Sequence, residues 1–267
     1  MKVFVLGNGE SRKTIDLDAL KTEGRVYGCN AIYRDCVVDS LVSVDGGMMH
    51  EIYSSGYALE NQCYFRGWNR LPDFLYRDMV NLEDYLDWPD GVLIENERGS
   101  KKEFVMNGTD PRQMQVLYDH YKSMGSDDKT IEALLSKHHQ WITWVEKTDK
   151  VESIPVNFEG WSAGPIAVRI ALDKEAPSEV YLLGFDLTSV DGKINNVYKG
   201  TDNYLAEDCV ATPHTNWVKQ HADNFRDFPH VKFYKVNSEE LNFEVSEWSE
   251  FENVKYVFQK DIDIPLL

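Results

Sequence analysis

Short apolar runs that alternate with helix-forming segments constrain the fold of this chain more than any other feature. Val3 to Leu6 and Glu179 to Leu183 are two such runs, and each stops at a glycine. Short, nearly continuous apolar runs are typical of strands that are buried on both faces, as in a parallel sheet. The segments 165–172 and 213–225 each begin at a proline and favour helices. Strands that alternate with helices predict βαβ units.

We therefore expect one α/β domain over residues 1–267, with a Rossmann-like, mostly parallel sheet. Right-handed crossovers would place helices on both faces of that sheet. Less regular residues at about 46–150 are interpreted as an inserted helical region. Within it, Asp110 and Pro111 can begin a helix, and apolar residues at three- and four-residue spacing predict another from about Asp128 to Glu146. Further strands are predicted at 25–29, 40–44, 91–94 and 231–236.

The charge balance restricts the partners of the chain. Its 28 Lys and Arg residues face 45 Asp and Glu residues, which gives a formal net charge of −17. This charge disfavours nucleic acid and anionic lipid as partners. The longest apolar run falls well short of the roughly 20 residues of a membrane span, and the N-terminal run is shorter than that of a signal peptide. We expect a cytoplasmic protein, with homo-oligomer formation left open.

Small and polar residues follow four of the predicted strands, where an open parallel sheet binds its ligands. The loop 7–11 follows the first strand, and Asn30, Asp45 and Asp186 follow three others. Glycines let a backbone approach a ligand closely, free N–H groups can cradle phosphate, and asparagine both donates and accepts hydrogen bonds. Each motif alone is also compatible with an ordinary turn. Together they favour a nucleotide site.

Two predicted helix starts add candidates. Ser162 and Gly164 lie at one of them, where a helix N-terminus can bind an anion, although Ser162 can equally be an ordinary N-cap. His214 lies at the other and suits a general base, the alternative being a surface or capping histidine. The candidate nucleotide- or donor-binding residues are Gly7, Asn8, Gly9, Ser11, Asn30, Asp45, Ser162, Gly164 and Asp186.

Metal binding is not expected. The triplets 16–18 and 261–263 have the Asp-x-Asp pattern that can hold a divalent cation. Neither triplet follows an internal strand of the predicted sheet, so the first is interpreted as a turn and cap and the second as a tail. No metal ligand is assigned.

Several of these motifs, in this order, resemble the bacterial lipooligosaccharide sialyltransferases. The wider superfamily contains motility-associated flagellin glycosyltransferases and the archaeal 6-hydroxymethylpterin pyrophosphokinase, and Asp39 and Asp45 look closer to that branch. The resemblance covers roughly residues 1–45 and 160–237. The motifs that carry it are Gly7-Asn8-Gly9-Glu10-Ser11, Cys29-Asn30-x-x-Tyr33, Ser162-Ala163-Gly164 and the strand Val180 to Asp186.

This resemblance implies an inverting, metal-independent transferase with no cofactor. Its partners would be a nucleotide-sugar donor, CMP-linked in the sialyltransferases, and a glycan or other hydroxyl acceptor. His214 matches the catalytic base, and Tyr198 matches one of two tyrosines that stabilise the departing phosphate. The chain departs from the family where Glu10 replaces a proline and Thr188 replaces the second tyrosine.

Two other functions stay open on the sequence. A pyrophosphokinase-like enzyme would use Mg-ATP, with Asp39, Asp45 or Asp186 near the phosphates. A non-catalytic module would bind a nucleotide without turnover.

Overall fold

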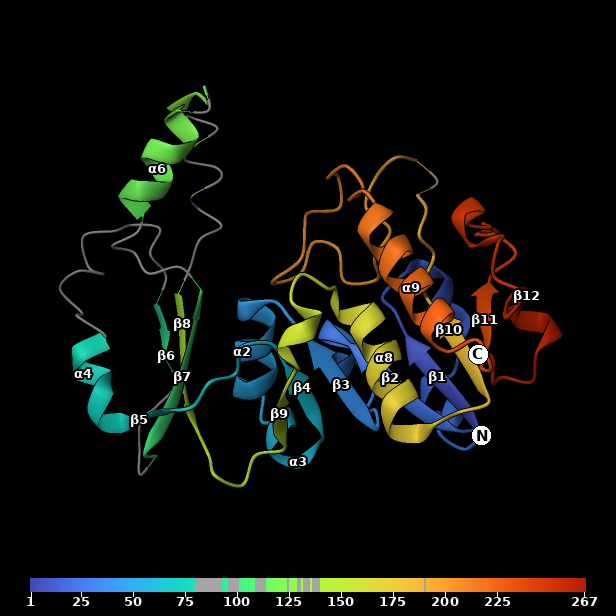
Figure 1. Ribbon diagram of the computed structural model, residues 1–267, viewed down its shortest axis with the longest axis horizontal. Coiled ribbons are helices and arrows are strands. Elements are labelled where there is room, and N and C mark those ends of the chain that lie inside the picture. Colours follow the sequence, from blue (N-terminus) through green and yellow to red (C-terminus); the bar gives the residue numbers. More distant parts are fainter. Residues whose placement is uncertain are drawn as a thin grey trace. The chain divides into compact units, whose positions relative to one another are not determined.

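A mostly parallel sheet of eight strands organises the protein (Figure 1). The computed structural model describes residues 1–79, 93–95, 101–108, 114–123, 125–128, 131, 135, 140–189 and 191–267. The strand order is β12-β11-β10-β1-β2-β3-β4-β9. The strands are β1 (Lys2–Leu6), β2 (Arg25–Cys29), β3 (Ser40–Ser43), β4 (Cys63–Phe65), β9 (Val151–Ser153), β10 (Glu179–Leu183), β11 (Lys232–Asn237) and β12 (Val254–Phe258).

The predicted α/β class is confirmed, because the apolar runs form the middle of this sheet. β1 pairs in parallel with β10, from Lys2 opposite Glu179 to Leu6 opposite Leu183, and it pairs in parallel with β2 on its other edge. The last four residues of β1 are fully buried. A central strand that is covered on both faces needs an uninterrupted apolar run, so this strand could be recognised from the sequence.

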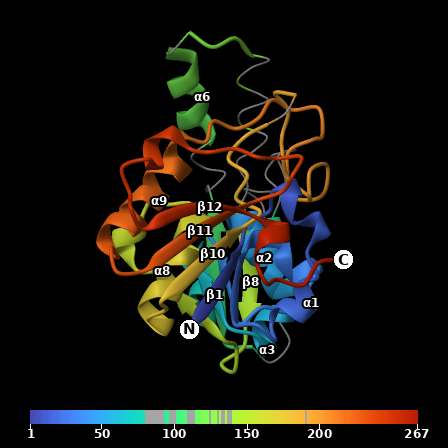
Figure 2. The same ribbon diagram turned by 90° about the vertical axis from the view of Figure 1, so that its right-hand side faces the viewer.

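Helices cover both faces of the sheet, as expected. Figure 2 shows α8 and α9 on one side and α1 on the other. α8 packs against β1, β2, β3 and α9. The helices and 3-10 turns of this part are η1 (Glu10–Thr14), α1 (Leu17–Leu20), η2 (Asn30–Arg34), η5 (Val156–Phe158), α8 (Ala163–Glu175), α9 (Thr215–Asp227), η6 (Ser246–Trp248) and η7 (Gln259–Asp261).

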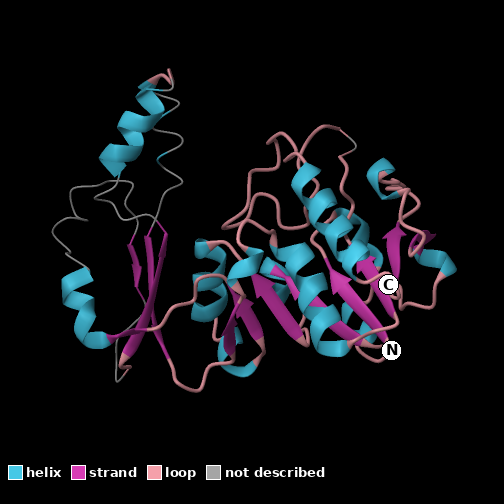
Figure 3. Ribbon diagram, in the orientation of Figure 1, coloured by secondary structure: helices cyan, strands magenta, loops and turns pink. Residues whose placement is uncertain are grey.

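The chain divides into two compact units. The first comprises residues 1–44, 61–64 and 154–267, and the second comprises residues 45–60 and 65–153. The second unit covers most of the residues that the sequence marks as less regular. Besides helices it contains a four-stranded sheet in the order β5-β7-β8-β6, which is visible in Figure 3. Besides β9, its described elements are α2 (Gly46–Ser54), α3 (Tyr57–Glu60), β5 (Leu71–Pro72), η3 (Asp73–Leu75), α4 (Tyr76–Met79), β6 (Leu93–Glu95), β7 (Glu103–Gly108), α6 (Met114–Ser123) and β8 (Gln140–Val145).

The helix predicted from Asp128 to Glu146 is wrong over its C-terminal part, where Gln140–Val145 forms β8. β8 pairs with β7 in antiparallel register, and Trp144 is fully buried between Phe104 and Tyr76. Aromatic and β-branched residues favour strands, and this preference outweighs the helical spacing. Asp110 and Pro111, the predicted start of the preceding helix, lie outside the described residues.

The core of the first unit contains a histidine that the sequence did not single out. His221 on α9 is fully buried among Phe185, Phe225 and Trp248, with ring centroids 4.9 to 6.2 Å away. Neither ring nitrogen has a hydrogen-bond partner among the described residues. Burial lowers the pKa of His221 to about 3. The imidazole is therefore neutral in the folded protein at neutral pH.

This burial predicts an acid-sensitive fold. The unfolded chain takes up a proton at His221 below about pH 6.5, whereas the folded chain does not. Above about pH 6.5 the buried His221 therefore does not reduce the free energy of unfolding, and below that pH the free energy of unfolding falls as the pH drops towards the pKa of the folded state. Between pH 6.5 and 5, the free energy of unfolding should drop by about 2 kcal/mol through this group. Urea unfolding of the wild type and of His221→Phe at both pH values measures the difference, and an equal pH dependence in the two proteins would contradict it.

Candidate active site

The loops that follow β1 and β10 bind each other directly. The N–H of Gly7 donates to the carbonyl of Leu183 at 2.7 Å, and the N–H of Gly9 donates to the carbonyl of Gly184 at 2.8 Å. A Cβ on Gly7 would lie only 2.5 Å from the oxygen of Gly184, whose own φ is +68°. The glycines are thus required for the contact between the two loops. The chain passes from β1 to β2 on one side of β1, whereas β10 lies on the other side of β1 and is followed by β11. The carboxyl ends of β1 and β10 therefore form the topological switch point, which is where open α/β sheets bind ligands.

This pairing corrects one expectation from the sequence. The N–H groups of Gly7 and Gly9 are used within the protein, that of Glu10 donates to Asn195 Oδ1 at 2.9 Å, and that of Ser11 donates to Asp186. The predicted phosphate cradle is therefore not formed by these backbone groups as they stand here.

Asp186 holds the β1 loop in place. Its carboxylate accepts a hydrogen bond from the Ser11 N–H at 3.1 Å and another, short one from the Ser11 hydroxyl. The side chain is 6% exposed, and a Cβ on Gly9 would lie 2.4 Å from its Oδ2 atom. From the sequence, Asp186 and Ser11 were predicted to bind the nucleotide or the sugar donor. The structure brings them together and directs them at each other.

Asn8 lies at the switch point with an unused acceptor. Its Nδ2 donates to the Cys29 carbonyl at 3.3 Å and to the Tyr204 hydroxyl at 3.2 Å, which fixes the orientation of the amide. Its Oδ1 atom is buried and has no hydrogen-bond partner among the described residues. Buried polar atoms are almost always hydrogen-bonded, so this acceptor is open to a donor from a ligand or from water.

Asn30 begins the turn after β2. Its φ is +55°, a left-handed conformation that asparagine tolerates better than most residues, and its Oδ1 accepts from Ser43 Oγ at 3.2 Å. The backbone N–H of the next residue, Ala31, donates to the Tyr204 hydroxyl at 3.4 Å. Tyr204 thus bridges the loops after β1 and β2.

The start of α8 packs between the β10 loop and α9. Ser162 is the N-cap residue, but its hydroxyl makes no capping hydrogen bond, and its N–H donates to Gln220 Oε1 at 2.9 Å. A Cβ on Gly164 would lie 2.7 Å from the ring of Phe185. Gly164 is therefore explained by close packing against Phe185, the residue before Asp186.

His214 occupies the N-cap position of α9 and is half-buried. Burial lowers its pKa, whereas a hydrogen bond with the Leu187 backbone and the charge of Asp186 raise it. The net shift is downward, so the imidazole is predominantly neutral at pH 7 and can accept a proton. The structure therefore brings His214, Asp186 and Ser11 to one edge of the sheet.

Tyr198 lies in a network with Arg12 and Asp35 that the sequence did not indicate. Tyr198 and Arg12 are buried, whereas Asp35 is exposed. Tyr198 is 6% exposed, and its hydroxyl accepts from Arg12 Nη2 at 2.7 Å and donates to Asp35 Oδ2 at 2.7 Å. Arg12 also binds Asp35 at 2.8 Å. Desolvation is the main cause that raises the pKa of Tyr198. The three residues come from segments that are far apart in the sequence, so no local motif indicates the network.

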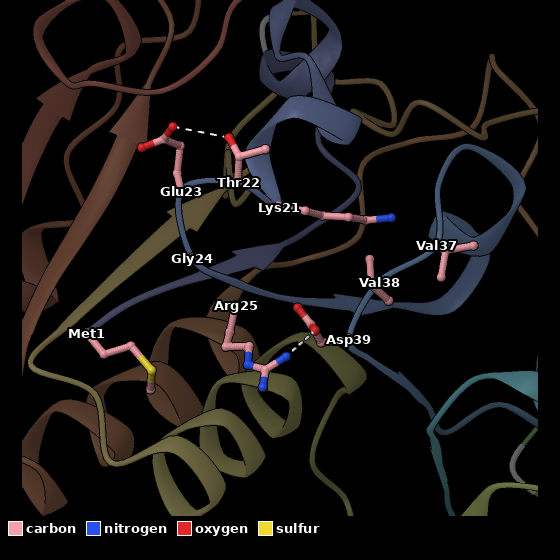
Figure 4. A pocket seen from close by; sticks show the side chains of 9 residues that line it. All are labelled: Met1, Lys21, Thr22, Glu23, Gly24, Arg25, Val37, Val38 and Asp39. Atoms are coloured by element: carbon pink, nitrogen blue, oxygen red, sulfur yellow. Dashed lines mark hydrogen bonds and ion pairs between the residues drawn. The ribbon is translucent and has the colours of Figure 1, made fainter.

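Two acidic residues of the pyrophosphokinase-like alternative, Asp39 and Asp186, lie at opposite edges of the sheet. Asp39 lies just before β3, where it binds Arg25 at 2.8 Å and accepts from the Val26 N–H at 2.7 Å. This is the amino edge of the sheet, opposite the edge of Asp186, and Asp39 there lines a cavity of about 500 Å³ (Figure 4). Asp45 belongs to the second unit, and desolvation raises its pKa while the charge of Arg66 lowers it.

One buried lysine near this site was not predicted from the sequence. Lys235 on β11 is 1% exposed and donates to Asn237 Oδ1. Burial lowers its pKa to about 8, and the charge of Asp186 opposes that shift. Lys235 is therefore a buried cation near Asp186, and its position in a strand does not by itself indicate this.

The described residues contain no cluster of three or more His, Cys, Asp or Glu side chains arranged to hold a metal ion. Asp16, from one Asp-x-Asp triplet, instead caps α1 by accepting from the Ala19 N–H at 3.0 Å. Among the helices that the structure describes, none is both long and apolar enough to cross a bilayer.

Comparison with known proteins gives no family model and no curated protein that matches the chain. Solved structures that it resembles include a CST-II sialyltransferase in complex with a trisaccharide acceptor and CMP. That match has 16% identity, a TM-score of 0.37, and covers 88% of this chain and 80% of that one. Another is the monofunctional alpha-2,3-sialyltransferase Cst-I from Campylobacter jejuni, with 13% identity, a TM-score of 0.40, and 94% of this chain and 79% of that one covered.

Proposed function

We propose that the protein is a nucleotide-sugar-dependent, inverting glycosyltransferase that needs no metal and uses His214 as its general base. The observation that carries the proposal is the half-buried imidazole of His214, whose lowered pKa keeps it unprotonated at neutral pH beside the carboxyl edge of the sheet. A general base must be unprotonated at the working pH and close to the ligand-binding edge. The proposal that the substrate is a nucleotide-sugar rests on the sequence motifs that resemble those of the sialyltransferases.

In this mechanism His214 takes the proton of an acceptor hydroxyl as that oxygen attacks the anomeric carbon of the donor. The bond from the anomeric carbon to the phosphate oxygen breaks, and the nucleotide leaves with its electron pair. The imidazolium that forms is stabilised by the negative charge of Asp186. One neutral base becomes a cation beside an existing carboxylate, which lowers the cost of the proton transfer.

The donor nucleotide would lie over the ends of β1 and β2. The Oδ1 atom of Asn8, which has no partner in the described part of the chain, would accept a hydrogen bond from a base amine or a ribose hydroxyl. The phosphate would lie at the N-terminus of α8, whose 13 residues give it a helix dipole. Tyr198 would assist the leaving phosphate only after its hydroxyl exchanges Asp35 for the phosphate.

A nucleotide screen tests the binding half of the proposal. We expect CMP to raise the melting temperature by several degrees at a concentration near 100 times its Kd, with EDTA present. UDP, GDP and ATP with and without Mg²⁺ are the comparison ligands, measured by differential scanning fluorimetry. Stabilisation by ATP with Mg²⁺ alone would overturn the proposal in favour of the pyrophosphokinase-like enzyme. Nucleotide binding without turnover of any donor would favour the non-catalytic module.

A further inference from the structure

A cavity of about 720 Å³ lies at the carboxyl ends of β1, β10, β11 and β12. Lys13, Lys193, Lys199 and Lys260 line it, and we call it the lysine cavity. These lysines come from η1, from the long connection between β10 and α9, and from η7. A volume of this size is typical of small-molecule sites. His214 is not among its lining residues.

Two of the lysines converge on one carboxylate. The Nζ atoms of Lys13 and Lys199 lie 2.6 and 3.3 Å from the same oxygen of Glu10. Lys13 is the first cause that lowers the pKa of Glu10, with Lys199 contributing in the same direction. Two ammonium groups around one carboxylate are the arrangement of an anion site, and here the chain supplies its own anion.

The remaining charges of the cavity are nearly balanced. Lys260 pairs with Glu239, while Asp191 accepts from the N–H of Lys193 at 2.9 Å and Glu240 also lines the wall. The charge of Lys193 also acts on Asp191, whose pKa it helps to lower. A bare anion therefore gains little from the cavity as a whole, and its binding must be completed by neutral contacts.

Hydroxyl-binding and apolar groups supply those contacts. Ser189, Ser238 and Asn195 line the wall with polar side chains that also hydrogen-bond the protein backbone, and Phe258 and Leu241 add apolar surface. Sugar hydroxyls both donate and accept hydrogen bonds, and their C–H faces pack on apolar side chains. The lining thus fits a polyol that carries one anionic group.

We propose that the lysine cavity binds an anionic saccharide, whose phosphate or carboxylate displaces the Glu10 carboxylate from between Lys13 and Lys199. Glu10 acts as an internal competitor for the ligand. The wild-type protein consequently binds weakly, and removal of the Glu10 charge strengthens binding. This site is independent of the proposed transferase activity.

Isothermal titration calorimetry tests this site with four probes at low salt, where ion pairing is strongest. Glucose 6-phosphate and glucuronate distinguish a phosphate from a carboxylate, and glucose and inorganic phosphate test each half alone. We expect one of the two anionic sugars to bind saturably and at least tenfold more tightly than glucose or phosphate. Equal affinity for inorganic phosphate would overturn the saccharide assignment.

Two variants are expected to change the binding affinity in opposite directions. We expect Glu10→Gln to tighten binding severalfold, because both lysines lose their internal partner, and Lys199→Ala to weaken it at least fivefold. Lys21→Ala is the matched control, since Lys21 lines the other cavity at the opposite edge of the sheet (Figure 4). Unchanged or weaker binding by Glu10→Gln, or absence of saturable binding by that variant, would overturn the proposal. Circular dichroism verifies that each variant is folded.

Discussion

Replacing His214 with alanine is expected to lower kcat of the proposed transferase by about 10²- to 10⁴-fold, the usual contribution of a general base. The donor affinity should change little, because the imidazole acts on the acceptor hydroxyl. The fold should persist, since His214 is only half-buried and its side chain makes no capping hydrogen bond to α9. Steady-state kinetics with a CMP-sugar and a hydroxyl acceptor measure kcat and KM separately.

His230→Ala is the matched control, because His230 is an exposed histidine beyond the other end of α9. That variant should retain wild-type activity. The lowered pKa of His214 places the acid limb of kcat/KM below about pH 6.5, since activity falls as the imidazole becomes protonated. Full activity of His214→Ala would show that the assigned base is wrong.

Removal of the Asp186 carboxylate should cause the largest loss of stability that we predict. Asp186→Ala should lower the free energy of unfolding by about 3–5 kcal/mol, because two buried hydrogen bonds to a charged group disappear. The N–H and hydroxyl of Ser11 lose their acceptor, and the buried ammonium of Lys235 loses a nearby negative charge. Urea denaturation at pH 7 measures the change.

Asp208→Asn is the control for this variant, since Asp208 is an exposed carboxylate in the same connection between β10 and α9. It should change stability by less than about 0.5 kcal/mol. Asp186→Asn separates charge from shape. Because the charge of Asp186 raises the pKa of His214, its loss should move the acid limb of kcat/KM to lower pH. A stability of Asp186→Ala equal to that of the wild type would contradict the structural role of this residue.

The architecture of the eight-stranded sheet was largely predictable from the sequence, whereas among the described strands of the second unit only β6 has a predicted counterpart, the strand expected at 91–94, which it overlaps at residues 93 and 94. β1, β2 and β10 were found because the strand residues that are buried on both faces of the sheet are mostly apolar. The short strand β4 offers only three residues, and β8 alternates too weakly to be separated from a helix. β12 is half-exposed at the edge of its sheet, so its residues are under no such compositional constraint.

For the candidate site, the sequence determined which residue types follow each strand, and the tertiary structure decided how they are used. The turns at Gly7 and Gly184 could be predicted from the sequence, because glycine is typical of turns and Gly184 adopts a φ of +68°. Their partners could not, because the hydrogen bonds join loops far apart in the chain, as between Ser11 and Asp186. Such contacts arise only when parallel strands bring distant loops to one edge of the sheet. These contacts occupy N–H groups of the first loop that the sequence assigns to phosphate binding. The Oδ1 atom of Asn8, in contrast, has no partner among the residues that the structure describes.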